Sequence, residues 1–179
     1  MLSKLLEILV RFISSLLKSK TRVETTPPEV KPVEVAQIPQ PKPPVEVSAG
    51  VDPHKYFSRT EYLKGRDVEY PLDATLEANM KNLLIAITPI REAWKNPIGV
   101  NSGYRPGRYN EAAGGSKKSS HLTCEAIDLH DREGKLAKFI IDGGWLEKCD
   151  LYMEDPKATP GWVHLQTRKT SSGIRVFRP

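Results

Sequence analysis

The pattern of hydrophobic and polar residues divides the chain into three segments. Besides Met1, residues 1–18 contain ten large apolar residues and neither proline nor glycine. On a helix, at about 100° per residue, the polar residues of this segment gather within about 120° and the apolar residues cover the rest. We therefore expect an amphipathic helix over residues 1–18, whose apolar face needs a covering surface.

Two interpretations of this helix remain open. Glu7 and Arg11 interrupt the apolar residues, so no uncharged run reaches the about 18 residues of a spanning helix. A cleaved signal peptide does not fit either. Lys4, Arg11 and Lys18 could face the anionic headgroups of a membrane surface. Alternatively, the helix docks on a partner protein or on a second copy of the chain.

The second segment, residues 19–50, is expected to be a linker. It holds seven of the 15 prolines and no aromatic residue. Proline removes backbone donors and biases its neighbours towards extended conformations, so neither a helix nor a sheet can propagate. We expect an extended tether in this segment.

The third segment, residues 51–179, begins with patterns typical of helices. Ser58 and Glu61 form a capping box, which predicts a short helix. Asp73 can cap a longer helix whose apolar residues recur at steps of three and four. Pro89 is expected to kink or end that helix.

Strand patterns dominate the remainder of this segment, and they predict an α+β fold with a mostly antiparallel sheet and flanking helices. The predicted strands cover 98–104, 125–129, 151–154, 162–167 and 174–177, with short helices near 109–113 and 135–141. The strands at 151–154 and 162–167 are expected to form a hairpin.

Charge and composition exclude some classes of protein. The net charge is +5, and residues 1–20 supply three of these charges. The remaining domain is mildly basic and lacks the clustered Lys and Arg of a nucleic-acid binder, so no nucleic-acid partner is expected. The two cysteines cannot staple a small fold.

The histidines are the first candidates for chemistry. In the strand that ends at Leu129, Asp128 shares a face with His130, and in a later strand His164 shares a face with Gln166. His121 follows a loop of small polar residues. Two imidazoles and one carboxylate with an open fourth position are typical of catalytic zinc. A hydrogen-bonded structural pair is the alternative.

Four motifs occur in a specific order. They are Ser102-Gly-Tyr-Arg105, the glycine pair with Lys and Ser at 114–119, Ser119-x-His121-x-x-Cys124-x-Ala126-x-Asp128, and Trp162-Val163-His164. Together they resemble the zinc D-alanyl-D-alanine carboxypeptidase family and its phage endolysin relatives, which have the hedgehog/DD-peptidase fold. The resemblance spans residues 56–168.

This resemblance implies roles for individual residues. His121, Asp128 and His164 match the ligands of one Zn2+ ion. Arg105 matches an arginine that binds a carboxylate or carbonyl oxygen of the substrate, and a guanidinium fork suits a carboxylate. Ser119 matches a serine near the substrate. A surface salt bridge for Arg105 and simple loop capping for Ser119 are the alternatives.

The sequence departs from the family at the general base. Several branches carry an acidic residue three positions before the last zinc histidine, where this chain has Gly161. We expect Glu154, at the end of the preceding strand, to serve as the catalytic base beside His164. Asp155 and Glu125 are weaker candidates.

Cys124 is a second departure, because the family has glycine there. We expect a buried, small apolar side chain, although a fourth metal ligand and a disulfide with Cys149 remain alternatives. His130 is expected beside the site or at the surface rather than as a ligand.

The resemblance implies a zinc metallopeptidase that hydrolyses peptidoglycan stem peptides, as a D,D-carboxypeptidase or an L-Ala–D-Glu endopeptidase. Residues 1–18 would hold it at a membrane surface or partner protein, in the cell envelope, the periplasm or a phage particle. The alternatives are a non-catalytic, zinc-containing module that binds peptidoglycan, and a structural component of a virion or envelope.

Overall fold

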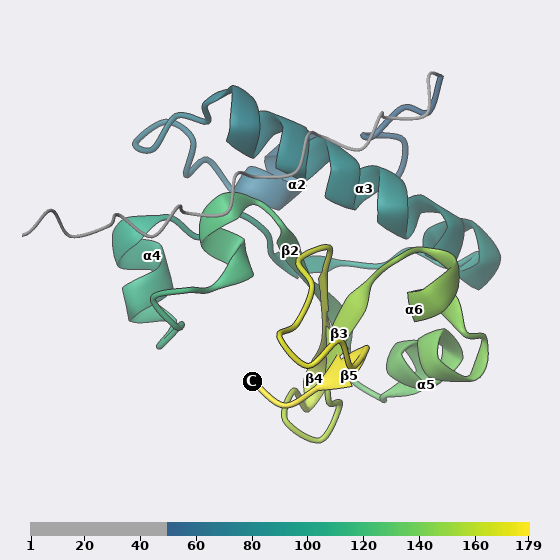
Figure 1. Cartoon of the computed structure of the whole chain (residues 1–179). Coiled ribbons are helices and arrows are strands. Elements are labelled where there is room, and N and C mark those ends of the chain that lie inside the picture. The colour runs from purple at the N-terminus through teal and green to yellow at the C-terminus, as the bar shows by residue number, and fades with distance from the viewer. Residues whose placement is uncertain (1–49) are drawn as a thin grey trace, which may run out of the picture. The chain divides into compact units, whose positions relative to one another are not determined.

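The computed structural model describes residues 50–179, which form an α+β fold (Figure 1). The elements are α2 (Arg59–Leu63), α3 (Ala74–Trp94), β1 (Val100–Ser102), α4 (Gly107–Ala112), the 3-10 helix η1 (Ser120–Thr123), β2 (Ala126–Asp131), α5 (Lys135–Asp142), α6 (Trp145–Lys148), β3 (Tyr152–Glu154), β4 (Gly161–Gln166) and β5 (Val176–Phe177). The predicted amphipathic helix at 1–18 and linker at 19–50 lie outside the described residues, apart from Gly50. Between residues 50 and 179, no helix has the length and apolar character needed to cross a membrane.

The five strands form one mixed sheet in the order β1-β2-β4-β3-β5. Neighbouring strands are antiparallel except β3 and β5, which run parallel. The β3–β4 pairing confirms the predicted hairpin. The long β2–β4 ladder sets Asp128 directly opposite His164, and β1 sets Ser102 beside Asp128. The register thus brings polar residues from distant parts of the chain into one row.

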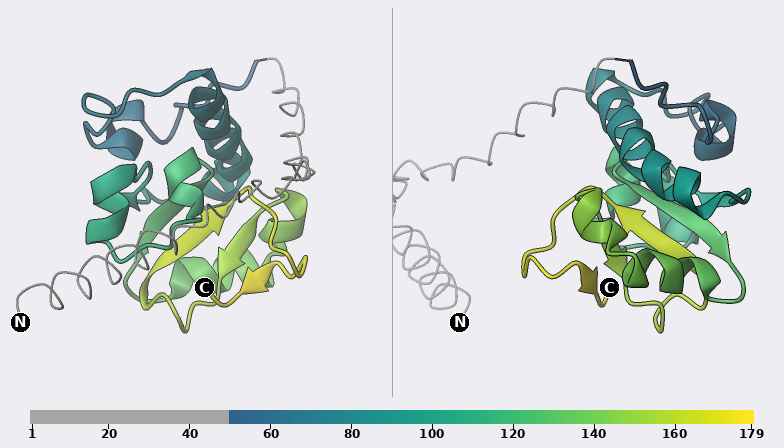
Figure 2. Two further views of the ribbon diagram at one scale, coloured as in Figure 1. Left: turned by 60° about the vertical axis from the view of Figure 1, so that its left-hand side comes forward. Right: turned by 90° about the vertical axis from the view of Figure 1, so that its right-hand side faces the viewer.

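The helices bury one face of this sheet. α3 runs along the sheet, with α5 and α6 close to it (Figure 1 and Figure 2). In β2 and β4, alternate residues belong to the hydrophobic core, which also includes the apolar stripe of α3: Ile127, Leu129, Val163, Leu165, Met80, Leu83, Leu84, Ile87 and Ile90. Because side chains alternate along a strand, Asp128 and His164 point away from this core, towards the opposite face.

The predicted helix starts are confirmed. The Ser58 hydroxyl accepts from the Glu61 backbone N–H, and the Glu61 carboxylate accepts in return from the Ser58 N–H at 3.0 Å. The Asp73 carboxylate accepts from the Leu76 N–H at 2.8 Å. These side chains satisfy backbone donors that a helix leaves free in its first turn.

Pro89 does not end α3, which continues to Trp94. Ile87 and Ile90 lie on either side of the proline and are each about 1% exposed. Burial of two such side chains contributes several kcal/mol, about 1.5–3 for each. This burial offsets the backbone hydrogen bond that proline removes, whose loss with the accompanying clash costs about 3 kcal/mol.

Candidate metal centre

His121 reaches the site from η1, a short helix that the sequence pattern did not predict. The Ser119 hydroxyl caps η1 by accepting from the His121 N–H at 3.3 Å. The His121 carbonyl accepts from the Arg105 N–H at 3.1 Å. These bonds fix the backbone on both sides of a histidine whose side chain is fully buried.

Three donor atoms converge between η1, β2 and β4. His121 Nε2 lies 3.2 Å from Asp128 Oδ1, and His164 Nδ1 lies 2.8 Å from the same oxygen. The two ring nitrogens are 3.2 Å apart. All three residues are buried, so these atoms face one another instead of solvent.

The contact made by His121 Nδ1, the ring nitrogen that points away from the other donors, shows that Nε2 carries the free lone pair. His121 Nδ1 lies 2.6 Å from the Gly103 carbonyl oxygen. A carbonyl oxygen only accepts, so in the neutral ring the proton is on Nδ1 and Nε2 carries the free lone pair. A metal ligand oriented by a backbone carbonyl is a recurring arrangement in metal sites.

The spacing of the donors fits a single small cation. Zinc bonds to histidine nitrogen and carboxylate oxygen are about 2.0–2.2 Å, so tetrahedral ligands lie about 3.3–3.5 Å apart. The separations of 2.8, 3.2 and 3.2 Å are slightly shorter, and a small outward shift would accommodate an ion. One carboxylate and two imidazoles leave a fourth position open, as in catalytic zinc sites.

The charges of the three groups depend on one another. Burial alone would raise the pKa of Asp128, but hydrogen bonds with His121 and His164 hold that pKa well below its usual range. Burial lowers the pKa of His121 despite its contact with Asp128. Burial also opposes protonation of His164, but Asp128 and Glu154 together raise its pKa. Asp128 is therefore an anion at neutral pH.

Arg105 borders the donor cluster. Its Nη1 lies 3.4 Å from Asp128 Oδ2, and its Nε is buried without a hydrogen-bond partner. Its side chain is 18% exposed and lines a cleft, so part of the guanidinium remains accessible. The ion pair is therefore made with the carboxylate of the site instead of a surface partner.

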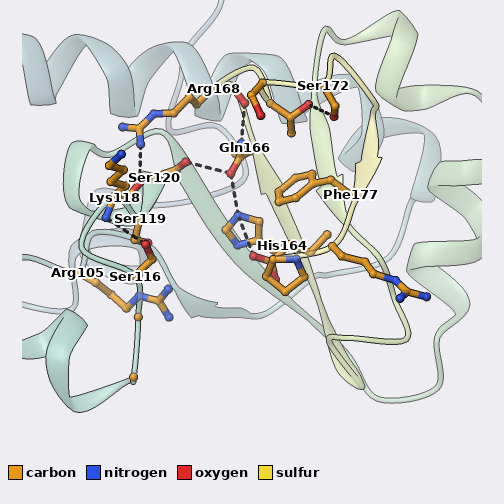
Figure 3. A pocket seen from close by; sticks show the side chains of 17 residues that line it. Arg105, Ser116, Lys118, Ser119, Ser120, His164, Gln166, Arg168, Ser172 and Phe177 are labelled. Carbon is orange, nitrogen blue, oxygen red and sulfur yellow. Dashed lines mark hydrogen bonds and ion pairs between the residues drawn. The ribbon is translucent and has the colours of Figure 1, made fainter.

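The cleft has a volume of about 490 Å3 and opens beside His164 (Figure 3). One wall comes from the loop that contains Lys118 and Ser119, and another from the C-terminal residues, including Phe177. The Phe177 ring lies edge-on to the His164 ring, with centroids 6.4 Å apart. Ser119 thus lines the cleft as well as capping η1.

The three candidate carboxylates have different surroundings. Glu154 lines the cleft, and its Oε1 lies 4.0 Å from His164 Nε2. Asp155 instead accepts from the Lys157 N–H at 3.0 Å. Glu125 is bound by Arg168, whose Nε lies 2.9 Å from its Oε2. Of the three, Glu154 is the one that the structure places beside His164, next to the outer nitrogen of its ring.

The backbone explains the absence of an acidic residue at position 161. Gly161 has φ +96°, a conformation that residues with a side chain rarely adopt. An acidic side chain there would strain the turn that leads into β4. The carboxylate beside His164 therefore comes from β3.

Cys124 also lies in the left-handed region, with φ +57°, and is completely buried. This φ accounts for glycine in the family motif, because glycine adopts it without strain. Burial raises the pKa of the Cys124 thiol to about 12. Cys124 and Cys149 are both free thiols, so the disulfide alternative is wrong, and Cys124 is not among the three clustered donors.

Two residues of the site were not predicted to have roles there. Gln166 contacts His164, and the Phe177 ring lies edge-on to the His164 ring. The sequence signal for Gln166 was strand alternation, which places it on the same face of its strand as His164. His130 lies on an exposed part of β2, away from the donor cluster.

Comparison with known proteins identifies the family. Residues 55–142 match the family described as Peptidase M15. This stretch includes Arg105, His121 and Asp128, whereas Glu154 and His164 lie beyond it. No curated protein and no solved structure matches the chain. The match confirms the resemblance to the zinc D-alanyl-D-alanine carboxypeptidases and places residues 55–142, 88 of the 179 residues of the chain, in the peptidase M15 family.

Proposed function

We propose that this protein is a zinc-dependent peptidase that cleaves peptide bonds in the stem peptides of peptidoglycan. One observation carries the proposal: His121, Asp128 and His164 bring three buried donor atoms together beside an open cleft. The match of residues 55–142 to the peptidase M15 family supports zinc and peptide hydrolysis as the chemistry of this site. We also propose that the α+β domain has a hedgehog/DD-peptidase-like fold.

Three polar residues of the cleft have a part in this reaction, together with the three donors. A zinc ion held by the three donors would supply a Lewis acid that polarises the scissile carbonyl and activates water. Glu154 accepts the proton of the attacking water and delivers it to the leaving amine. Arg105 binds a carboxylate or carbonyl oxygen of the substrate through its accessible guanidinium. Ser119 contacts the substrate from the wall that contains Lys118.

The charge of the cleft supports an acidic peptide as substrate. Its lining includes four basic residues: Arg105, Lys118, Arg168 and Arg178. Glu154 is the acidic residue of this lining. Asp128, Glu125 and Asp155 offset part of the charge of Arg105, Arg168 and Arg178. The remaining positive charge, including that of Lys118, attracts the carboxylates of a stem peptide. A D,D-carboxypeptidase and an L-Ala–D-Glu endopeptidase both satisfy this requirement.

Zinc content and hydrolysis test the proposal together. The purified full-length chain should bind one zinc ion and release amine from synthetic stem peptides. Chelation should abolish the release, and added zinc should restore it. The H121A variant should lose both. One bound zinc without cleavage of any D,D or L-Ala–D-Glu bond would instead support the non-catalytic, peptidoglycan-binding alternative.

We further propose that residues 1–18 hold the enzyme at an envelope membrane or phage particle, with 19–50 as a tether. The amphipathic sequence pattern supports this role. The full chain should sediment with vesicles containing anionic phosphatidylglycerol, and an L9E/I13E double variant should not. Equal recovery of both proteins in the supernatant would favour a protein partner.

A further inference from the structure

Gln166 contacts the outer nitrogen of His164, on the side of the ring away from Asp128. Its Oε1 lies 3.2 Å from His164 Nε2 and 2.9 Å from the Ser120 hydroxyl. Figure 3 shows this row of contacts running from Ser120 through Gln166 to His164. The row links η1, which carries His121, to β4, which carries His164.

The orientation of the Gln166 amide follows from its third partner. Gln166 Nε2 donates to the Arg168 carbonyl oxygen at 2.6 Å. A carbonyl can accept only from the NH2 end of the amide, so the oxygen end must face His164 and Ser120. Ser120, His164 and Gln166 are 5–7% exposed, so water has little access to these contacts.

An acceptor at His164 Nε2 selects one tautomer of the neutral ring. The proton lies on Nε2, where it is donated to Gln166, and the lone pair lies on Nδ1. Nδ1 is the atom 2.8 Å from Asp128 Oδ1 and 3.2 Å from His121 Nε2. His121 has the opposite tautomer, because the Gly103 carbonyl accepts from its Nδ1.

We propose that Gln166, oriented by Ser120 and the Arg168 carbonyl, is a positioning residue that holds His164 in the tautomer and orientation required for metal binding. This inference rests on the proposed metal site. Glu154 cannot replace Gln166 in the structure as it stands, because its carboxylate is 4.0 Å from His164 Nε2, beyond hydrogen-bonding distance.

Zinc affinity of the full-length chain, measured by competition with a chromophoric chelator, tests the inference. Q166M keeps the side-chain length but removes the acceptor, and should weaken zinc binding by about 10–100-fold, as loss of such partners does elsewhere. Q166E keeps an acceptor oxygen and should recover most of the affinity. S120A should have a smaller effect than Q166M, because it removes only the hydrogen bond from Ser120 to the Gln166 amide oxygen and leaves the acceptor at His164 in place.

T167V provides the matched control. Thr167 follows Gln166, and its hydroxyl makes a 3.5 Å contact with the Glu125 carbonyl instead of the histidine. Its zinc affinity should equal that of the wild type. Unchanged affinity in Q166M, or equal losses in Q166M and Q166E, would overturn the inference.

Nitrogen-15 NMR of the metal-free chain gives a second readout that does not require zinc. At a pH where both rings are neutral, His164 should carry its proton on Nε2 in the wild type and in S120A. Q166M should lose this preference, whereas the His121 tautomer should stay unchanged. A wild-type His164 protonated on Nδ1 would overturn the inference. Failure of the wild type to bind zinc would overturn the proposed function, even if the predicted tautomer were present.

Discussion

Replacing Glu154 by glutamine tests the assignment of the catalytic base. The substitution keeps the shape of the side chain but removes its ability to accept a proton. General-base catalysis contributes about 10²–10⁴-fold, which corresponds to about 2.7–5.4 kcal/mol of transition-state stabilisation. Because Glu154 is not among the clustered donors, E154Q should retain one zinc ion while kcat falls by this factor.

Asp155 offers a control next to Glu154 in the sequence. Its carboxylate caps a turn by accepting from the Lys157 N–H, so D155N should cost about 0.5–1.5 kcal/mol of stability and little activity. The assay is kcat on a synthetic stem peptide, with the zinc content of each variant measured in parallel. An E154Q enzyme that keeps more than about a tenth of wild-type kcat would refute the assignment, because even the weakest general base contributes more. An equal loss in D155N would also refute it.

Three further predictions concern stability and substrate binding. In the metal-free chain the lowered pKa of Asp128 contributes stability above its unfolded value of about 4, which is lost as pH falls. In D128N, the free energy of unfolding, measured by urea denaturation at a series of pH values, should therefore fall less steeply on the acidic side. F177A, which opens one wall of the cleft, should raise KM more than it lowers kcat. C124G should be about 1 kcal/mol more stable than C124A in denaturation, because alanine retains the strain at φ +57°; equal stabilities would contradict this explanation.

The helix starts and the core stripe were predictable because their signals are local. Ser58 and Asp73 each satisfy a backbone donor within three residues, and that spacing can be read in the sequence. The continuation of α3 beyond Pro89 was not predictable in the same way. It depends on burial of Ile87 and Ile90 against distant elements, which a local rule for proline does not include.

The candidate site was predictable as a set of residues but not as an arrangement. The motif around His121 and Asp128 indicated zinc chemistry, whereas the distances depend on the β2–β4 register and on η1. A 3-10 helix of four residues has no hydrophobic period to reveal it. The role of Gln166 was hidden for a similar reason, because its partner Ser120 lies 46 positions away.

The most direct test of zinc-dependent peptidoglycan cleavage is mass spectrometry of purified peptidoglycan after incubation with the zinc-loaded full-length protein. We predict new fragments that result from hydrolysis of one type of peptide bond in the stem peptide, absent after chelation and restored by zinc. Fragment masses would identify the bond and decide between a carboxypeptidase and an endopeptidase. Unchanged peptidoglycan in the presence of a protein that carries one zinc ion would contradict the proposed function.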